Sequence, residues 1–157
     1  MSNLQRITQI TFDEETVIRR SPGIEQERRS AVYDLLEDNS FRPVGDFIGP
    51  YKVIMGMEEN RLVLNIRNTD DQPLTRVLVP LMPFRSVIKD YFKVCESYFQ
   101  AIKTAQPSKI QAMDMGRRSL HNDGSDLLRA RLDGKIVVDF ETARRLFTLI
   151  CILQIKR

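Results

Sequence analysis

The stretch from Phe84 to Thr104 constrains the fold more than any other, because its apolar residues recur with the period of an α-helix. They fill one sector roughly 160° wide around the helix axis, and charged or amide side chains occupy the opposite side. The apolar sector consists of Phe84, Val87, Ile88, Tyr91, Phe92, Val94, Cys95, Tyr98, Phe99 and Ile102. A face this broad must be covered, so we expect the helix to lie on a β-sheet. An apolar ligand pocket or a dimer interface is the alternative use of such a face.

Three strands before that helix supply the sheet. Residues 51–58, 61–67 and 74–81 alternate between two side-chain faces with the period of a strand, and short turns separate them. The pattern predicts an antiparallel meander with one apolar face. Residues 4–12, which are rich in β-branched side chains, predict a fourth strand, and residues 135–138 are a further extended piece.

Helical patterns fill most of the remaining chain. A helix is predicted over residues 21–38, where Ser and Pro stand at its start. Another over 108–121 ends in an Asn-Asp-Gly-Ser turn at 122–125, and a short helix over 126–132 follows. Asp139 is expected to cap a last helix that ends near Lys156 and whose C-terminal half is apolar nearly all round.

These elements predict one α+β domain over residues 1–157. We expect a small antiparallel sheet of four to five strands, including the three-stranded meander, covered by about five helices mostly on one face. The length of 157 residues suits one hydrophobic core.

The composition narrows the functional classes. Cys95 and Cys151 belong to no Cys-x-x-Cys pair, and His121 is the only histidine, so we expect buried, reduced thiols, no metal site and no cofactor. The first residues lack the apolar core of a signal peptide. The longest nearly apolar run, residues 146–153, is shorter than the roughly 20 residues that cross a bilayer. We therefore expect a cytoplasmic protein without membrane association.

Positive charge is concentrated toward the end of the sequence. Residues 107–157 hold 10 Lys and Arg against 6 Asp and Glu, a net charge of +4, and the residues before them hold 14 against 15, a net charge of −1. This basic third permits an anionic partner, RNA or a ribosome included. Nucleic acid is a weaker prediction, because the basic residues form no dense patch and no aromatic side chains stand between them for stacking.

Residues 117–126 form the one candidate site. Arg117 and His121 lie four residues apart on the border of an apolar stripe, so they share a helix face. Arg117 can bind phosphate or carboxylate through its planar guanidinium, and His121 can donate a hydrogen bond or transfer a proton near neutral pH. Asn122, Ser125 and Asp126 follow at the start of the predicted short helix, where backbone N–H groups attract anions. We predict a site for a small anion or a phosphorylated ligand.

Arg28 is a possible further member of this site. It falls inside the apolar stripe of the helix over 21–38, between Ile24 and Leu35. An unpaired buried charge is costly, so its guanidinium must find a carboxylate, a carbonyl or an anion, or extend to the protein edge.

A structural clamp is the alternative interpretation of the candidate site. In that case Arg117 pairs with Asp126 or Asp139, and His121 caps the end of the preceding helix. Three other arginines are expected on the solvated surface: Arg118 (paired with Asp114), Arg144 and Arg145.

Four segments, residues 27–41, 89–98, 115–125 and 143–153, carry a family resemblance. Two of them read Met-Gly-Arg-Arg-Ser-Leu-His-Asn-Asp-Gly-Ser and Ala-Arg-Arg-Leu-Phe-Thr-Leu-Ile-Cys-Ile-Leu. With them the chain resembles, over nearly its whole length, an uncharacterised bacterial protein family, number 0262 of the UPF series. The resemblance implies a small, stand-alone cytoplasmic protein, and it brings no catalytic residues.

Three functions remain open on these grounds. The favoured one is a non-catalytic binding or regulatory module that acts on a protein partner or as a homo-oligomer, because the sequence has much apolar helix surface and no Walker, Gly-x-Gly-x-x-Gly or Gly-x-Ser-x-Gly motif. The second is an enzyme or sensor of a phosphorylated small molecule, which would use Arg117 and His121. The third is RNA or ribosome association through the basic third.

Overall fold

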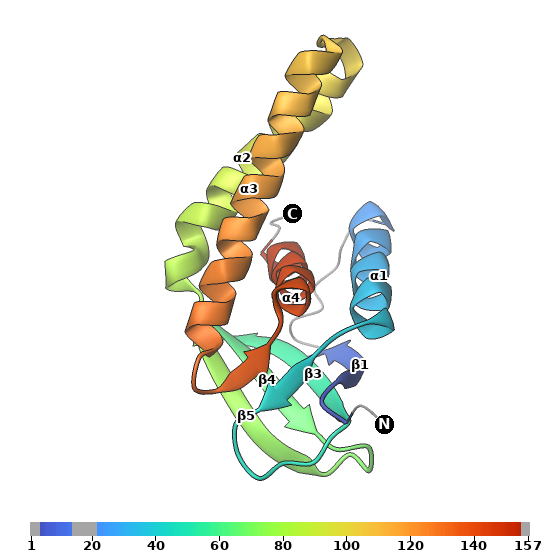
Figure 1. Ribbon diagram of the computed structural model, residues 1–157, viewed down its shortest axis with the longest axis vertical. Helices are drawn as coiled ribbons and strands as arrows, with labels where there is room; N and C mark the ends of the chain where they lie inside the picture. Colours follow the sequence, from blue (N-terminus) through green and yellow to red (C-terminus); the bar gives the residue numbers. More distant parts are fainter. Residues whose placement is uncertain (1–3, 14–21, 155–157) are drawn as a thin grey trace.

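The computed structural model describes residues 4–13 and 22–154, the side chains of residues 22–24 excepted (Figure 1). Its elements are β1 (Ile7–Phe12), α1 (Pro22–Glu37), β2 (Phe41–Pro43), β3 (Tyr51–Glu58), β4 (Arg61–Arg67), β5 (Pro73–Pro80), the 3-10 turn η1 (Met82–Phe84), α2 (Arg85–Thr104), α3 (Pro107–Leu132), β6 (Ile136–Val138) and α4 (Phe140–Leu153). The predicted helix start at Ser21 and the predicted helix end near Lys156 lie outside the described residues.

The predicted meander is confirmed. β3 pairs antiparallel with β4, and β4 pairs antiparallel with β5, in a four-stranded sheet of order β1-β3-β4-β5. Met55, Leu64 and Val77 lie opposite one another across these strands, and all three are buried. The alternation in sequence therefore marks the side of the sheet that faces the core.

The prediction that the whole sheet is antiparallel is wrong. β1 pairs parallel with β3, with Ile10 opposite Val53, so the main sheet is mixed. Parallel strands need a long crossover, and α1 lies in the segment between these two strands. The extended piece near residues 135–138 does not join this sheet, because β6 pairs antiparallel with β2 as a separate two-stranded sheet.

α2 packs mainly against α3, and only its first turns, with η1 before them, reach the core, which corrects the expectation that α2 lies on the sheet. Phe84 and Ile88 are buried, but the distal half runs beside α3 in a helical hairpin that projects from the body (Figure 1). Phe99 and Ile102 on this projecting part remain 60% and 47% exposed. The apolar face is thus divided between the core, the partner helix and open surface.

α3 is one helix of 26 residues, so the predicted turn at residues 122–125 is wrong, and the described residues form four α-helices where about five were expected. Gly124 is helical and buried, and a Cβ at this position would overlap the Phe147 ring. The Ser125 hydroxyl donates to the His121 carbonyl at 2.8 Å, within the helix. Tertiary packing against α4 therefore overrides the local turn preference of Asn-Asp-Gly-Ser.

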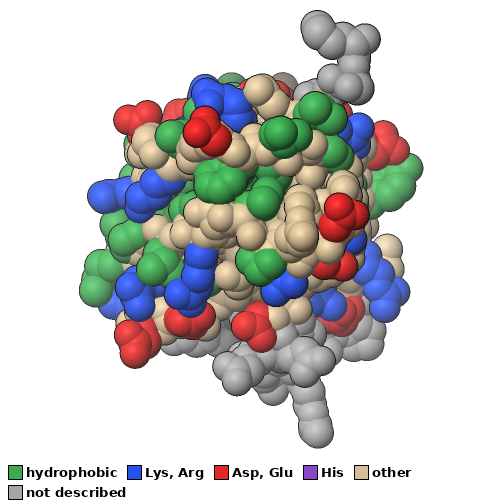
Figure 2. All heavy atoms as spheres, turned by 90° about the horizontal axis from the view of Figure 1, so that it is seen from below, with side chains coloured by type: hydrophobic (Ala, Val, Ile, Leu, Met, Phe, Trp, Pro, Cys, Tyr) green, Lys and Arg blue, Asp and Glu red, His purple; other side chains and the backbone are tan. Residues whose placement is uncertain are grey.

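α4 forms the centre of the core, as its apolar sequence predicts. Its residues from Leu146 to Leu153 are buried with the exception of half-buried Thr148, and the helix lies between α1, the hairpin and the sheet (Figure 1). Asp139 caps it as predicted, by accepting the backbone N–H of Thr142 at 2.8 Å. Seen from below, the end of the molecule away from the helices intersperses apolar, cationic and anionic side chains (Figure 2). The helical side is where the candidate site lies.

Candidate anion-binding pocket

A pocket of about 370 Å³ opens where the four helices meet, and we call it the arginine pocket. Its walls come from α1, α2, α3 and the first turns of α4. The lining residues are Asp34, Tyr91, Arg117, Arg118, His121, Glu141, Arg144, Arg145 and Thr148. The pocket brings together the two residues that the sequence singled out, Arg117 and His121, with three arginines that the sequence placed on the surface.

Asp114 holds the two arginines of α3. It pairs with Arg117, whose Nε lies 3.1 Å from Oδ1, and with Arg118, whose Nε lies 3.1 Å from Oδ2. The Arg118 pair is the one that the sequence predicts. Arg117 also lies over the Tyr98 ring, 5.1 Å from its centroid, so packing as well as charge fixes its position.

Arg144 and Arg145 extend into the pocket from α4. Arg144 pairs with Glu141 at 3.2 Å, and Arg145 donates to the Asp38 carbonyl at 2.7 Å, which ties α4 to the end of α1. Among the described residues, Nε of Arg144 is buried without a hydrogen-bond partner. Arg144 and Arg145 are half-buried, so they line the pocket and still contact solvent, and the expectation of a solvated face holds only in part. The sequence feature that could have predicted a place for Arg144 in the site is its spacing from Thr148, which places the two residues one turn apart on one helix face.

His121 is held as a neutral side chain. Thr148 has one hydroxyl proton, which it donates to the Arg144 carbonyl at 3.1 Å. The Thr148 oxygen therefore accepts the Nε2 proton of His121 at 2.8 Å. Within the described part of the chain, Nδ1 of His121 is buried and has no partner. Burial, together with the charges of Arg144 and Arg117, lowers the pKa of His121 to about 4.

Aromatic rings enclose His121 on α3. Its ring meets Phe147 edge-on at 5.1 Å and Tyr91 edge-on at 5.3 Å. Burial raises the pKa of Tyr91, and the nearby Arg117 guanidinium opposes that rise. Burial also raises the pKa values of Cys95 and Cys151, so both thiols stay protonated near neutral pH.

The other predicted site residues do not line the arginine pocket. Asn122 and Asp126 lie on α3 outside it, and Ser125 is fully buried with its hydroxyl on a backbone carbonyl. Arg28 pairs with Glu25 at 2.5 Å and lies 4.9 Å from the centroid of the Phe12 ring, beside a different hollow. The acid of the predicted clamp is Asp114 rather than Asp126 or Asp139.

Two further properties bear on the site. Over residues 4–13 and 22–154, no three His, Cys, Asp or Glu side chains gather as metal ligands would. No helix in this part of the chain combines the length and apolarity that crossing a bilayer requires.

Sequence comparison identifies relatives over the full length. The model of an uncharacterised protein family, UPF0262, matches residues 4–156. A UPF0262 protein of Paramagnetospirillum magneticum is 56% identical over 156 residues, which cover 99% of each chain. One from Rhodospirillum rubrum is 51% identical over 154 residues, covering 98% of this chain and 95% of its own. No solved structure matches the chain.

Proposed function

Because this chain belongs to the uncharacterised family UPF0262, whose description names no activity, we propose from the pocket itself that the protein is a non-catalytic module that binds a small anion. A phosphate ester is the ligand class that suits it best. Planar guanidinium groups bind phosphate oxygens in pairs, and such charge-assisted hydrogen bonds are the strong ones.

The gathering of four arginines around one pocket carries this proposal. Arg117, Arg118, Arg144 and Arg145 line it together with Asp34 and Glu141, and Asp114 pairs with two of these arginines. Because His121 is neutral, the net charge of this group is 4 − 3 = +1. The side chains of Arg117 and Arg144 are 28% and 36% exposed, so both are held in place yet reachable from solvent.

Proton transfer is not part of the proposal. A side chain that transfers protons near neutral pH needs a pKa near that pH, and His121 has one of about 4. Its Nε2 proton is already donated to Thr148. Asp114 and Glu141 instead keep the arginines extended until an anion arrives.

Binding of inorganic phosphate and of simple phosphate esters, followed by calorimetry and thermal unfolding, tests the proposal. Arg117→Gln and Arg144→Gln should each weaken binding about tenfold, the loss of one charge-assisted hydrogen bond. Arg129→Gln is the matched control, because Arg129 lies on α3, is exposed and does not line the pocket. Equal weakening by all three variants, or no binding by any of these anions at low salt, contradicts the proposal.

A protein partner or a second copy of the chain is the second candidate. It is favoured by large apolar side chains that the hairpin leaves at its surface: Phe99, Ile102 and Met115, which are 60%, 47% and 65% exposed. RNA association is less favoured, since four arginines of the basic third converge on a small pocket rather than on a broad face.

A further inference from the structure

An apolar groove of about 590 Å³ lies beside the arginine pocket, between α1, α2 and α4. We call it the apolar groove. Its lining is mostly hydrophobic and includes Phe92, Cys95 and Phe99 of α2 and Cys151 and Ile152 of α4. Volumes of a few hundred Å³ are those of ordinary ligand sites.

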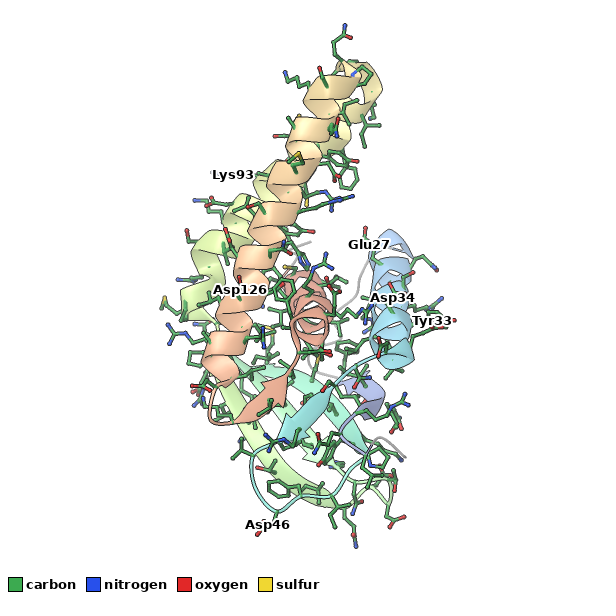
Figure 3. All side chains as sticks on the ribbon, viewed as in Figure 1. Glu27, Tyr33, Asp34, Asp46, Lys93 and Asp126 are labelled. Carbon is green, nitrogen blue, oxygen red and sulfur yellow. The ribbon has the colours of Figure 1, made fainter. Side chains whose placement is uncertain are left out.

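The apolar groove and the arginine pocket adjoin each other. Asp34, Tyr91, Arg117 and Thr148 line both, so Arg117 stands at the junction of a cationic end and an apolar end. Figure 3 shows Glu27 and Asp34 on the side of α1 toward α4 and the hairpin, and Tyr33 on the opposite side. Glu27 lines only the apolar groove, so a negative charge is repelled at that end and attracted at the other.

We propose that the ligand is a single-chain anionic amphiphile, with a phosphate head at the arginines and an alkyl or acyl chain along the apolar groove. The proposal rests on the anion-binding function above and names its ligand class. It concerns a monomeric, water-dissolved amphiphile rather than a lipid within a bilayer.

Charge and shape together select this occupant. A simple anion would fill the cationic end and leave the adjoining hydrophobic walls wet. A neutral hydrocarbon would fill the groove and leave the positive charge that the arginines hold in excess of their carboxylate partners without an anion. Only a molecule with both parts satisfies the two adjoining hollows together.

The dependence of affinity on the length of the ligand's alkyl chain tests this proposal. Each methylene that leaves water for an apolar wall is worth about 0.8 kcal/mol, which is about fourfold in affinity. Affinities of ethyl, butyl, hexyl and octyl phosphate, measured by calorimetry below their micelle concentrations, should therefore rise by up to about fourfold per methylene. Inorganic phosphate and octyl glucoside supply the head-only and chain-only references.

Phe99→Ser is the informative variant, because Phe99 lines the groove and is 60% exposed, so the fold does not depend on its ring. It should flatten the chain-length dependence and leave the affinity for inorganic phosphate unchanged. Met82→Ser is the control, since Met82 is 62% exposed and lies in η1 outside the groove. Arg117→Gln should weaken all phosphates, the short ones included.

The outcomes separate the two proposals. Phosphate binding that does not depend on chain length overturns the amphiphile and keeps the anion site. Octyl glucoside binding as tightly as octyl phosphate, with no binding of inorganic phosphate, overturns both. If Phe99→Ser dissociates a dimer but does not change how affinity depends on alkyl-chain length, the groove is a contact with a second copy of the protein. Binding to phosphatidylglycerol vesicles, with none to monomeric octyl phosphate, assigns it to a membrane surface. Either of these last two results overturns the amphiphile proposal.

Discussion

At the scale of single residues, two glycines on α3 form a matched pair. Gly124 lies against the Phe147 ring, where a Cβ would overlap the ring, whereas a Cβ at Gly116 would meet no atom within 4 Å. Both are helical, so both weaken the helix by their backbone entropy. Only one of them is required by its surroundings.

Gly116→Ala should stabilise the protein by about 0.5–1 kcal/mol, since alanine is the better helix former. Gly124→Ala should destabilise it by about 1–3 kcal/mol, because the Phe147 ring must move out of a packed core. Urea unfolding followed by circular dichroism measures both changes. Stabilisation by Gly124→Ala would show that the close approach of α3 and α4 described above is wrong.

Stability should fall as the pH drops below 6.5, because His121 is neutral in the folded state. The unfolded chain protonates histidine at its ordinary pKa of about 6.5, whereas the folded pKa is about 4. The unfolded state therefore binds more protons between these values, and acid favours unfolding there. Between about pH 7.5 and about pH 5 the loss from this group should be about 2 kcal/mol.

His121→Gln is the control for that measurement. Its amide can keep the hydrogen bond to Thr148 but does not titrate, so its stability should change less over the same pH range. Parallel curves for the two proteins, obtained by urea unfolding at each pH, would rule out His121 as the cause.

The sequence predicted only part of the candidate site at the level of single residues. The spacing of Arg117 and His121 placed them correctly on one face. The role of Gly124 was not readable from Asn-Asp-Gly-Ser, because it depends on the position of Phe147 on another helix. The pocket that Arg144 and Arg145 line was not predictable for the same reason, since it exists only once α4 lies against α3 and α1.

At the scale of elements, Asn39 joins the end of α1 to β1. Its side-chain carbonyl accepts the Ile7 N–H at 2.7 Å, and its amide donates to the Ile7 carbonyl at 3.0 Å and the Leu35 carbonyl at 2.9 Å. The residue is 6% exposed. One side chain thus satisfies backbone groups of an edge strand and of a helix end.

Asn39→Asp should destabilise the protein by about 3 kcal/mol, because it leaves two buried carbonyls without donors and turns a carboxylate toward them. The exposed Gln9→Glu on β1 is the control for added charge and should change stability by less than about 0.5 kcal/mol. Thermal unfolding near neutral pH measures the difference. Similar effects of the two changes would mean that Asn39 does not hold β1 to α1.

The sequence predicted those helices and strands whose packing partners are close to them in the chain. Alternation over residues 51–80 predicts the meander because each strand pairs with its neighbour in sequence. The parallel pairing of β1 with β3 depends on the crossover through α1 and on Asn39, which no local pattern encodes. The single long α3 depends likewise on tertiary packing that opposes a local turn signal.

At the scale of the whole molecule, the projecting hairpin leaves apolar surface without a covering element. Ile102 on α2 is 47% exposed, and Met115 on α3 is 65% exposed. We expect the protein to self-associate through this surface in the micromolar range. Ile102→Lys should shift sedimentation toward monomer, and Val137→Lys is the control, since Val137 is also 47% exposed but lies on β6. A strict monomer throughout that range contradicts this expectation.

The arginine pocket has walls that are made at different times. α1 leaves the ribosome first, the hairpin follows, and α4 with Arg144, Arg145 and Thr148 comes last. A nascent chain that has not released α4 therefore has no pocket, whatever the state of its earlier elements. The anion site proposed above therefore requires that α4 has been synthesised and has packed against α1 and the hairpin.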